Sequence, residues 1–188
     1  MLLRRRYLMR WLVIGLISNM SCLAFADNPP KVSMKTNMGE MVIELNPEKA
    51  PVTVKNFLEY VREGFYNGTI FHRIIPGFMI QGGGFDEKFQ EKPTRDVIKI
   101  ESKNGLQNKK YAIAMARTSD PDSATAQFFI NAKDNGFLDF PGRDGWGYAV
   151  FGKVISGTEV VDKIEQTKTG EDRSQPPKVV IKSVTVIE

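Results

Sequence analysis

From residue 31 onward, the chain consists mainly of short segments in which apolar and polar residues alternate, separated by Gly, Pro, Asn and Asp. A period of two residues places successive side chains on opposite faces of a strand, whereas an amphipathic helix requires a period of 3.6. Residues 32–34 and 41–45 both alternate, and a turn sequence at 36–39 separates them. The sequence therefore predicts an antiparallel, mainly β domain that begins with a hairpin.

Two segments depart from this period. In residues 52–63 apolar side chains recur at helical spacing, with Pro51 at the first turn and Gly64 beyond the end. Residues 156–159, Ser-Gly-Thr-Glu, have the spacing of a capping box, and one apolar face follows them. We expect two α-helices that cover the ends of a closed eight-stranded antiparallel β-barrel, because closure removes exposed strand edges. The other predicted strands are 69–75, 78–81, 97–100, 111–115, 127–131, 149–155 and 179–187.

The first 26 residues have the pattern of a cleavable secretory signal. Four arginines precede an apolar run at 11–16, and the segment ends in Ala24-Phe25-Ala26. We predict cleavage after Ala26, which leaves residues 27–188 as a single exported domain with the periplasm as its location. Without those four arginines the chain has 22 basic and 22 acidic residues. A body without surplus positive charge is not typical of proteins that bind nucleic acid or a membrane, so we expect neither partner.

Cysteine and histidine are too scarce for several kinds of chemistry. Cys22 is the only cysteine and lies in the signal segment, so the predicted mature domain has no disulfide, zinc thiolate or thiol nucleophile. His72 is the only histidine, and a G-x-S-x-G turn is missing, so we expect neither a serine hydrolase nor a metal site. The glycines at 82–84 lack the Lys-Ser/Thr of a phosphate-binding loop and are predicted to form a tight turn with positive φ. No cofactor is expected.

Arg73 and Gln81 interrupt the otherwise apolar strand sequence of residues 71–83, FHRIIPGFMIQGG. Placing an arginine in a barrel core is costly unless the charge is paired. One interpretation is an arginine held by internal pairing. The other places both polar side chains on a wall beside an apolar pocket that contains Phe78 and Met79. The residues alone leave both interpretations open.

Residues 71–83 resemble the signature of the cyclophilins, which are peptidyl-prolyl cis/trans isomerases, and in particular of their exported bacterial members. Further matching segments follow in the family's order and approximate spacing, at 114–116, 127–131, 137–138 and 148–152. The resemblance extends over residues 32–187, nearly all of the predicted mature domain. It implies a cyclophilin-like barrel and prolyl isomerase activity.

The resemblance also implies roles for individual residues. Arg73 would be the main catalytic residue, with Gln81 and Phe78 as further members of the catalytic group. The implied substrate-binding residues are Met79, Phe129 and Leu138 in the proline pocket, Gln127 at the substrate backbone, Ala116 and Arg117 beside the residues before proline, and Phe137 and Tyr148 on the rim. His72 would either support the site or pack behind the strand as a structural residue.

Three positions depart from the best-known eukaryotic pattern. Phe137 stands where those proteins carry tryptophan, Tyr148 where they carry histidine, and Arg117 where they commonly carry asparagine. Phenylalanine cannot supply the hydrogen-bond donor of an indole. We therefore expect weak cyclosporin binding without loss of isomerase activity.

The chemistry of prolyl rotation suits an arginine beside an apolar pocket. C–N resonance opposes rotation with a barrier of about 18–20 kcal/mol. At the twisted transition state the nitrogen lone pair leaves resonance, so a donor aimed at it stabilises that state more than either planar state. We predict a monomeric isomerase that assists the folding of exported proteins, with proline-containing peptides and unfolded or folding proteins as partners.

Two other hypotheses compete with this one. The first is a non-enzymatic proline-peptide binding module or holdase chaperone on the same scaffold, which would bind peptide without accelerating rotation. The second is a barrel that encloses a small apolar ligand. The crowded aromatic and β-branched alternation argues against the second, because it predicts a filled interior.

Overall fold

The computed structural model describes residues 28–167 and 178–187 of the 188-residue chain. The predicted signal segment, residues 1–26, lies outside the described residues. The strands are β1 (Lys31–Thr36), β2 (Gly39–Leu45), β3 (Thr69–Ile70), β4 (Arg73–Ile75), β5 (Met79–Gly82), β6 (Ala112–Met115), β7 (Phe128–Asn131), β8 (Val150–Ser156) and β9 (Val180–Val186). The helices are α1 (Pro51–Arg62) and α2 (Thr158–Glu165), with the short 3-10 helices η1 (Ser102–Asn104) and η2 (Gly136–Leu138).

All strands belong to one curled sheet with antiparallel pairing, in the order β3-β9-β1-β2-β8-β6-β7-β5-β4. The first and last strands of this order, β3 and β4, are consecutive in the chain, and only Phe71 and His72 lie between them. The chain itself therefore joins the two ends of the hydrogen-bonded ladder. The expected mainly β, antiparallel architecture with two helices is confirmed. Instead of the predicted closed eight-stranded barrel, the described residues form a nine-stranded curled sheet whose end strands do not pair with each other. The predicted strand 69–75 is divided because β3 pairs with β9 whereas β4 pairs with β5.

Two local predictions were wrong. Residues 97–100 form no strand and make only an isolated bridge between Ile98 and Ala124, with Val97 58% exposed. Alternation alone does not make a strand where no neighbouring strand completes the ladder. The expected capping box is also not formed, because Ser156 ends β8 and the N-cap of α2 is Gly157 with φ 75° and no side-chain cap. A Cβ at Gly157 would lie 2.2 Å from the carbonyl oxygen of Glu40, so close packing against β2 requires glycine there.

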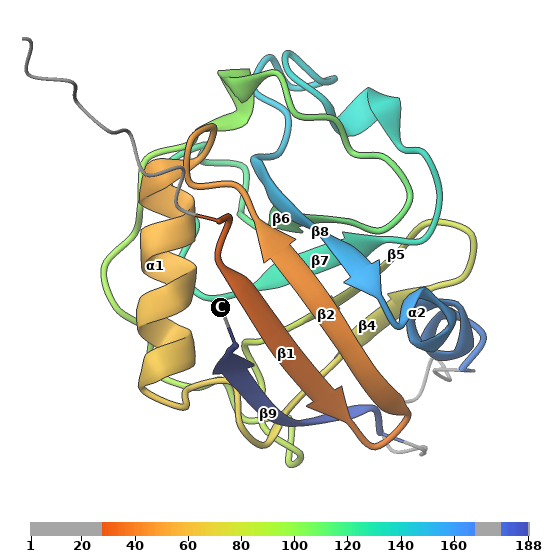
Figure 1. Ribbon diagram of the computed structural model, residues 1–188. Coiled ribbons are helices and arrows are strands. Elements are labelled where there is room, and N and C mark those ends of the chain that lie inside the picture. Colours follow the sequence, from red (N-terminus) through yellow and green to blue (C-terminus); the bar gives the residue numbers. More distant parts are fainter. Residues whose placement is uncertain (1–27, 168–177, 188) are drawn as a thin grey trace, which may run out of the picture.

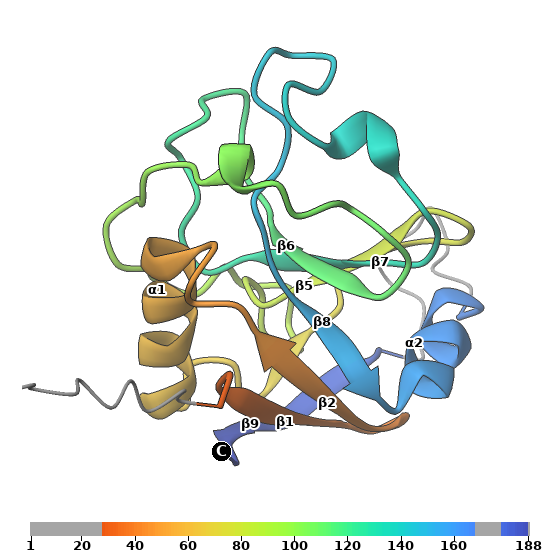
Figure 2. The ribbon, with the colours of Figure 1, turned by 45° about the horizontal axis from the view of Figure 1, so that its top comes forward.

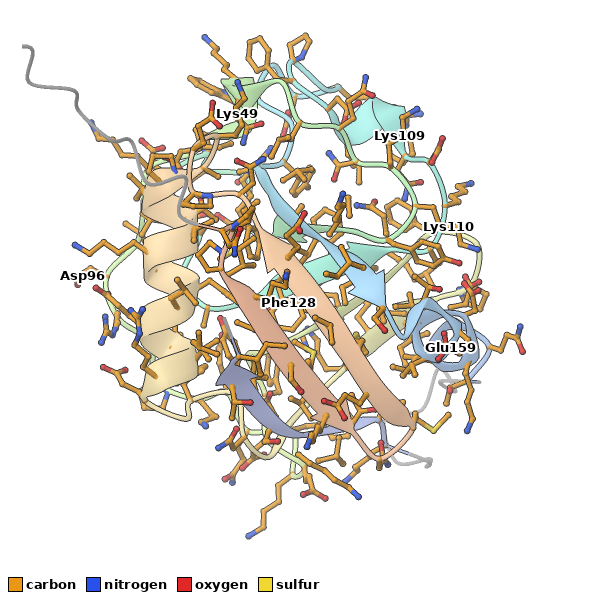
Figure 3. The ribbon with its side chains drawn as sticks, in the orientation of Figure 1. Lys49, Asp96, Lys109, Lys110, Phe128 and Glu159 are labelled. Atoms are coloured by element: carbon orange, nitrogen blue, oxygen red, sulfur yellow. The ribbon has the colours of Figure 1, made fainter. Side chains whose placement is uncertain are left out.

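The interior of the sheet is filled by aromatic side chains. Phe57 of α1 packs against Tyr66, Phe128 and Phe151 with ring centroids 5.1–5.9 Å apart, and all four side chains are fully buried. Figure 3 shows Phe128 in the middle of the molecule, whereas Asp96 lies at its outer edge. The space inside the curled sheet is therefore a packed core, as the sequence pattern predicts.

The two α-helices flank the curled sheet on opposite sides (Figure 1). Each helix buries one apolar stripe, which includes Phe57 and Val61 on α1 and Val161 and Ile164 on α2. The loops that precede β6 and β8 gather at one end of the molecule, at the top of Figure 2. Within the described residues, no helix combines the length and the apolar character that a membrane-spanning segment needs.

Candidate functional site

Arg73, Gln81 and Phe129 form one row across three neighbouring strands. Arg73 pairs with Gln81 between β4 and β5, and Gln81 pairs with Phe129 between β5 and β7. Because side chains alternate along a strand, the three residues project from the same face of the sheet. Their strand neighbours Ile74 and Ile80 point the other way and belong to the main core. The two-residue period thus places the polar pair on the outer face of the barrel.

This outer face carries a second apolar cluster, separate from the core inside the sheet. Phe78 and Tyr148 pack against it from loops and Leu138 packs against it from η2, all three as partly buried side chains. The buried members are Met79, Ala112, Ala114, Phe129 and Val150. The cluster supplies the apolar wall that the sequence required if Arg73 was not to lie in the core.

A hollow of about 220 Å³ opens beside this cluster. It is lined by Arg73, Phe78, Met79, Gln81, Ala116, Arg117, Phe129, Leu138 and Tyr148, all of which the sequence analysis had singled out. Arg73 is exposed at its edge, whereas Met79 and Phe129 are 2% and 5% exposed. Of the two interpretations left open by the sequence, the geometry therefore matches the arginine on the wall of an apolar pocket.

A short chain of hydrogen bonds orients the polar side chains of the hollow. Arg73 donates from Nη1 to Oε1 of Gln81 at 3.3 Å, and Gln81 donates from Nε2 to Oε1 of Gln127 at 3.0 Å. Gln81 thus accepts from the guanidinium and is itself held by Gln127. Gln127 does not line the hollow, but it fixes a residue that does.

The glycine turn after β5 makes room for Gln127. Gly83 has φ 85°, as the sequence predicted for this turn. A Cβ at Gly84 would lie 2.5 Å from Cγ of Gln127, which is closer than packed atoms approach. Gly84 therefore serves the site by leaving room for the Gln127 side chain.

The remaining predicted residues lie around the hollow. Phe137 is 43% exposed and stacks on Phe78 with ring centroids 5.8 Å apart, so it stands at the rim. Tyr148 meets Phe129 edge-on at 5.6 Å. His72 does not line the hollow, and its ring packs 4.6 Å from that of Phe85. The arrangement matches the structural role considered for His72.

Asn135 supports the hollow and was missed by the sequence analysis. It is fully buried, and its Nδ2 donates to the carbonyl oxygen of Phe78 and to Oδ1 of Asn131, both at 2.8 Å. The backbone carbonyl oxygen of Asn135 accepts a hydrogen bond from the backbone amide of Leu138 at 2.8 Å. Asn135 thus holds two residues of the pocket wall, Phe78 through its side chain and Leu138 through its backbone carbonyl group. An Asp-Asn-Gly sequence is typical of a turn, so the sequence carried no signal of this role.

A larger hollow of about 570 Å³ contains none of the predicted site residues. Its walls carry mixed charges, including Lys109, which pairs with Asp134, and Lys153, which pairs with Glu44. It lacks the aromatic side chains and the arginines that line the smaller hollow. Among the residues that the structure describes, no group of three or more His, Cys, Asp or Glu side chains is placed to hold a metal ion.

Comparison with known proteins agrees with this geometry. Residues 31–186 match the family described as cyclophilin type peptidyl-prolyl cis-trans isomerase/CLD. The chain is 56% identical over 163 residues to peptidyl-prolyl cis-trans isomerase B of Escherichia coli, covering 84% of this chain and 99% of that protein. It is 53% identical to peptidyl-prolyl cis-trans isomerase A of Dickeya dadantii, with 87% of each chain covered.

Solved structures of cyclophilin type isomerases are also similar to this chain. A cyclophilin type isomerase from Cryptosporidium parvum superposes with a TM-score of 0.71 at 26% identity, covering 85% of this chain and 98% of that chain. The same protein was also crystallised in the presence of the dipeptide Ala-Pro, and that structure has a TM-score of 0.70 at 27% identity over 84% of this chain and 99% of that one. The outer-face hollow, the family match and these relatives lead to one conclusion: the chain belongs to the cyclophilin-type peptidyl-prolyl cis-trans isomerases.

Proposed function

We propose that this isomerase acts through Arg73, whose guanidinium stabilises the twisted Xaa-Pro amide while the proline ring occupies the 220 Å³ hollow. The observation that carries the proposal is the Arg73–Gln81 hydrogen bond at the edge of the apolar wall. Gln81 holds the plane of the guanidinium, so an N–H group is already oriented before the amide twists. Phe78, Met79 and Phe129 supply the apolar surface that a proline ring requires.

The free energies indicate that several groups share the work. Lowering the relaxation time of a prolyl bond from about 10 s to about 1 ms is a factor of about 10⁴, or roughly 5 kcal/mol. One hydrogen bond to a charged group contributes about 1.5–3 kcal/mol. Arg73 therefore supplies about half. Removal of water and clamping of the flanking backbone by Gln81, which Gln127 holds in place, supply the rest.

Arg73→Ala tests this mechanism. We expect kcat/KM for a proline peptide to fall about 10- to 100-fold, because one charged hydrogen bond made in the transition state is lost. The measurement is a protease-coupled isomerase assay on residues 27–188, with circular dichroism to show that the fold persists. Arg73→Lys should recover little activity, because a lysine ammonium lacks the planar set of donors.

A matched control is available on α1. Arg62→Ala removes the same charge from an exposed position in the last turn of that helix. We expect this variant to keep wild-type turnover. Near-normal turnover in folded Arg73→Ala would refute the mechanism.

The substrates that we propose are proline-containing segments of exported proteins that are still folding. The Ala-Pro dipeptide in the C. parvum structure supports a proline-containing ligand, and the signal-like residues 1–26 support export to the periplasm. Uncatalysed prolyl isomerisation takes tens of seconds or more, so a folding catalyst has a use wherever proteins fold after translocation. Mass spectrometry of the mature amino terminus tests cleavage after Ala26.

A holdase function is a second candidate, and the exposed rim favours it. Phe137, Phe140 and Trp146 are 39–43% exposed and offer apolar surface to an unfolded chain. If binding alone matters, Arg73→Ala should still suppress the aggregation of an unfolded client.

Cyclosporin should bind weakly, since Phe137 offers no indole donor, and a peptide-competition titration measures this.

A further inference from the structure

The loop of residues 139–147 begins and ends in the wall of the proline pocket. Leu138 before it and Tyr148 after it both line the hollow, and the Tyr148 amide donates to the Leu138 carbonyl oxygen at 2.9 Å. Between these two residues the chain projects away from the body, at the top of Figure 2. Whatever fixes the loop therefore also fixes part of the pocket wall.

Arg117 reaches this loop from the segment after β6. Its side chain is only 3% exposed although it carries a charge. Nε and Nη2 donate to the carbonyl oxygen of Gly147 at 3.1 and 2.7 Å, and Nη1 donates to that of Thr118 at 2.9 Å. Nη2 also forms an ion pair with Asp144. All three nitrogens of the guanidinium are thus engaged within the protein, although Arg117 borders the hollow.

Asp144 holds the same stretch of chain from the other side. Its Oδ1 accepts from the amides of Trp146 and Gly147, both at 3.0 Å, while Oδ2 accepts from Arg117. The Arg117 guanidinium and these two amides hold the pKa of the Asp144 carboxyl well below its usual range. The two charged side chains therefore converge on Gly147, the residue immediately before Tyr148.

The ring of Tyr148 packs against the Arg117 guanidinium and also lines the hollow. The Arg117 guanidinium carbon is 4.4 Å from the centre of the Tyr148 ring, and on the pocket side this ring meets Phe129 edge-on. We propose that Asp144 and Arg117 are positioning residues that hold the Tyr148 ring on the pocket wall and thereby set the affinity for substrate. This inference rests on the proposed function of the hollow.

The test is Asp144→Asn, which keeps an oxygen for the two backbone amides and removes the negative charge that faces Arg117. We expect KM to rise about 5- to 10-fold and kcat to change less than about 2-fold, because the loosened wall weakens binding while Arg73 and Gln81 are untouched. Asp134→Asn is the matched control. Asp134 likewise accepts from a backbone amide, that of Lys110, and from the side chain of Lys109, but away from the hollow. Asp134→Asn should leave both KM and kcat unchanged.

A double variant separates positioning from a general effect on the fold. In the Tyr148→Ala background, Asp144→Asn should raise KM no further, because the ring through which it acts is missing. An unchanged KM in folded Asp144→Asn overturns the proposal. A further rise of equal size in the Tyr148→Ala background overturns it as well.

A measurement on the wild-type protein does not depend on activity or on the stability of a variant. The Nε–H of Arg117 should exchange with solvent at least about 10-fold more slowly than that of the exposed Arg62, because it is buried and donates to Gly147. Equal exchange rates contradict the proposal. If Arg73→Ala retains turnover while Asp144→Asn raises KM only when Tyr148 is present, the proposed mechanism fails and the positioning of Tyr148 stands.

Discussion

Gln81 shows how much of the site depends on single side chains. It joins Arg73 to Gln127 by one accepted and one donated hydrogen bond, and it also lines the hollow. If the Gln81 amide is removed, the Arg73 guanidinium loses its hydrogen-bond acceptor on β5. The orientation of Arg73 is therefore a property of the pair and not of the arginine alone.

Gln81→Met tests this coupling at nearly constant volume. We expect kcat to fall about 10-fold with a smaller change in KM, because the guanidinium must then be oriented during the reaction itself. Steady-state kinetics with a proline peptide give both parameters. Gln107→Met, at an exposed position in the wall of the larger hollow, should be silent. A normal kcat for Gln81→Met would show that Arg73 needs no support.

The aspartates predict how the protein responds to pH. The amide of Lys110 and the side chain of Lys109 lower the pKa of Asp134, and the Arg117 side chain lowers that of Asp144. A lowered pKa in the folded state stabilises the fold above the unfolded value of about 3.9, and this contribution is lost as the pH falls through the folded values. We expect Tm to fall below about pH 4, and to fall less steeply in Asp134→Asn/Asp144→Asn. Isomerase activity should be flat between about pH 6 and 8, because the proposed mechanism transfers no proton, and a bell-shaped profile would indicate acid–base chemistry.

At the scale of secondary structure, α1 is capped by a residue distant in sequence. Ala50 and Pro51 offer no side-chain cap, but the Glu101 carboxylate accepts from the amides of Val52 at 3.1 Å and Thr53 at 2.8 Å, and from the Thr53 hydroxyl at 2.7 Å. A carboxylate at this position satisfies unpaired amides and also meets the positive end of the helix dipole. The cap ties α1 to η1.

Glu101→Ala should therefore lower the free energy of unfolding by about 1–2 kcal/mol, the usual effect of losing a helix cap. Urea denaturation followed by circular dichroism measures it. Glu48→Ala, which removes an exposed carboxylate next to the same helix, should change stability by less than about 0.5 kcal/mol. Equal effects of the two substitutions would mean that Glu101 contributes no cap.

Periodicity predicted the elements well and the breaks between them poorly. Strands β5, β7 and β8 and helix α1 lie within one or two residues of the predicted bounds, because each has an apolar face that the core requires. Residues 97–100 alternate in the same way, but no neighbouring strand pairs with them. The predicted strand 69–75 is interrupted at Phe71 and His72 because its first part pairs with β9 and its second part with β5. The local sequence does not determine either pairing.

The site was predictable to the extent that its residues lie within strand motifs. All the residues that line the hollow were anticipated, and their strand register explains why Arg73, Gln81 and Phe129 meet. Asn135 and Asp144 were not anticipated, because both act from loops through backbone amides and carbonyl groups. Contacts of that kind depend on the path of the loop, which the pattern of apolar residues does not determine.

For the molecule as a whole, Phe128 and Phe129 separate stability from function. They are neighbours on β7, yet Phe128 packs against Phe57, Tyr66 and Phe71 inside the sheet, whereas Phe129 lines the hollow outside it. We expect Phe128→Ala to lower the free energy of unfolding by about 3–5 kcal/mol. The fraction that remains folded should keep its turnover.

Phe129→Leu, by contrast, should raise KM several-fold at a small cost in stability, because it changes the shape of the pocket but keeps an apolar side chain. Denaturant titration and steady-state kinetics on both variants make the comparison. If the Phe128 variant lost turnover in its folded fraction and the Phe129 variant did not, the assignment of inner and outer faces would be reversed.

If its substrates are unfolded chains, as proposed, the protein must avoid pairing its own strands with theirs, because an exposed strand edge can add a strand from another chain. Here the outermost strands, β3 and β4, are two and three residues long and follow each other directly along the chain. Edge strands this short offer few unpaired backbone groups with which another chain could form hydrogen bonds. The shortness of both end strands thus limits unwanted strand addition, and leaves side-chain surfaces such as the outer-face hollow as the places where another chain can bind.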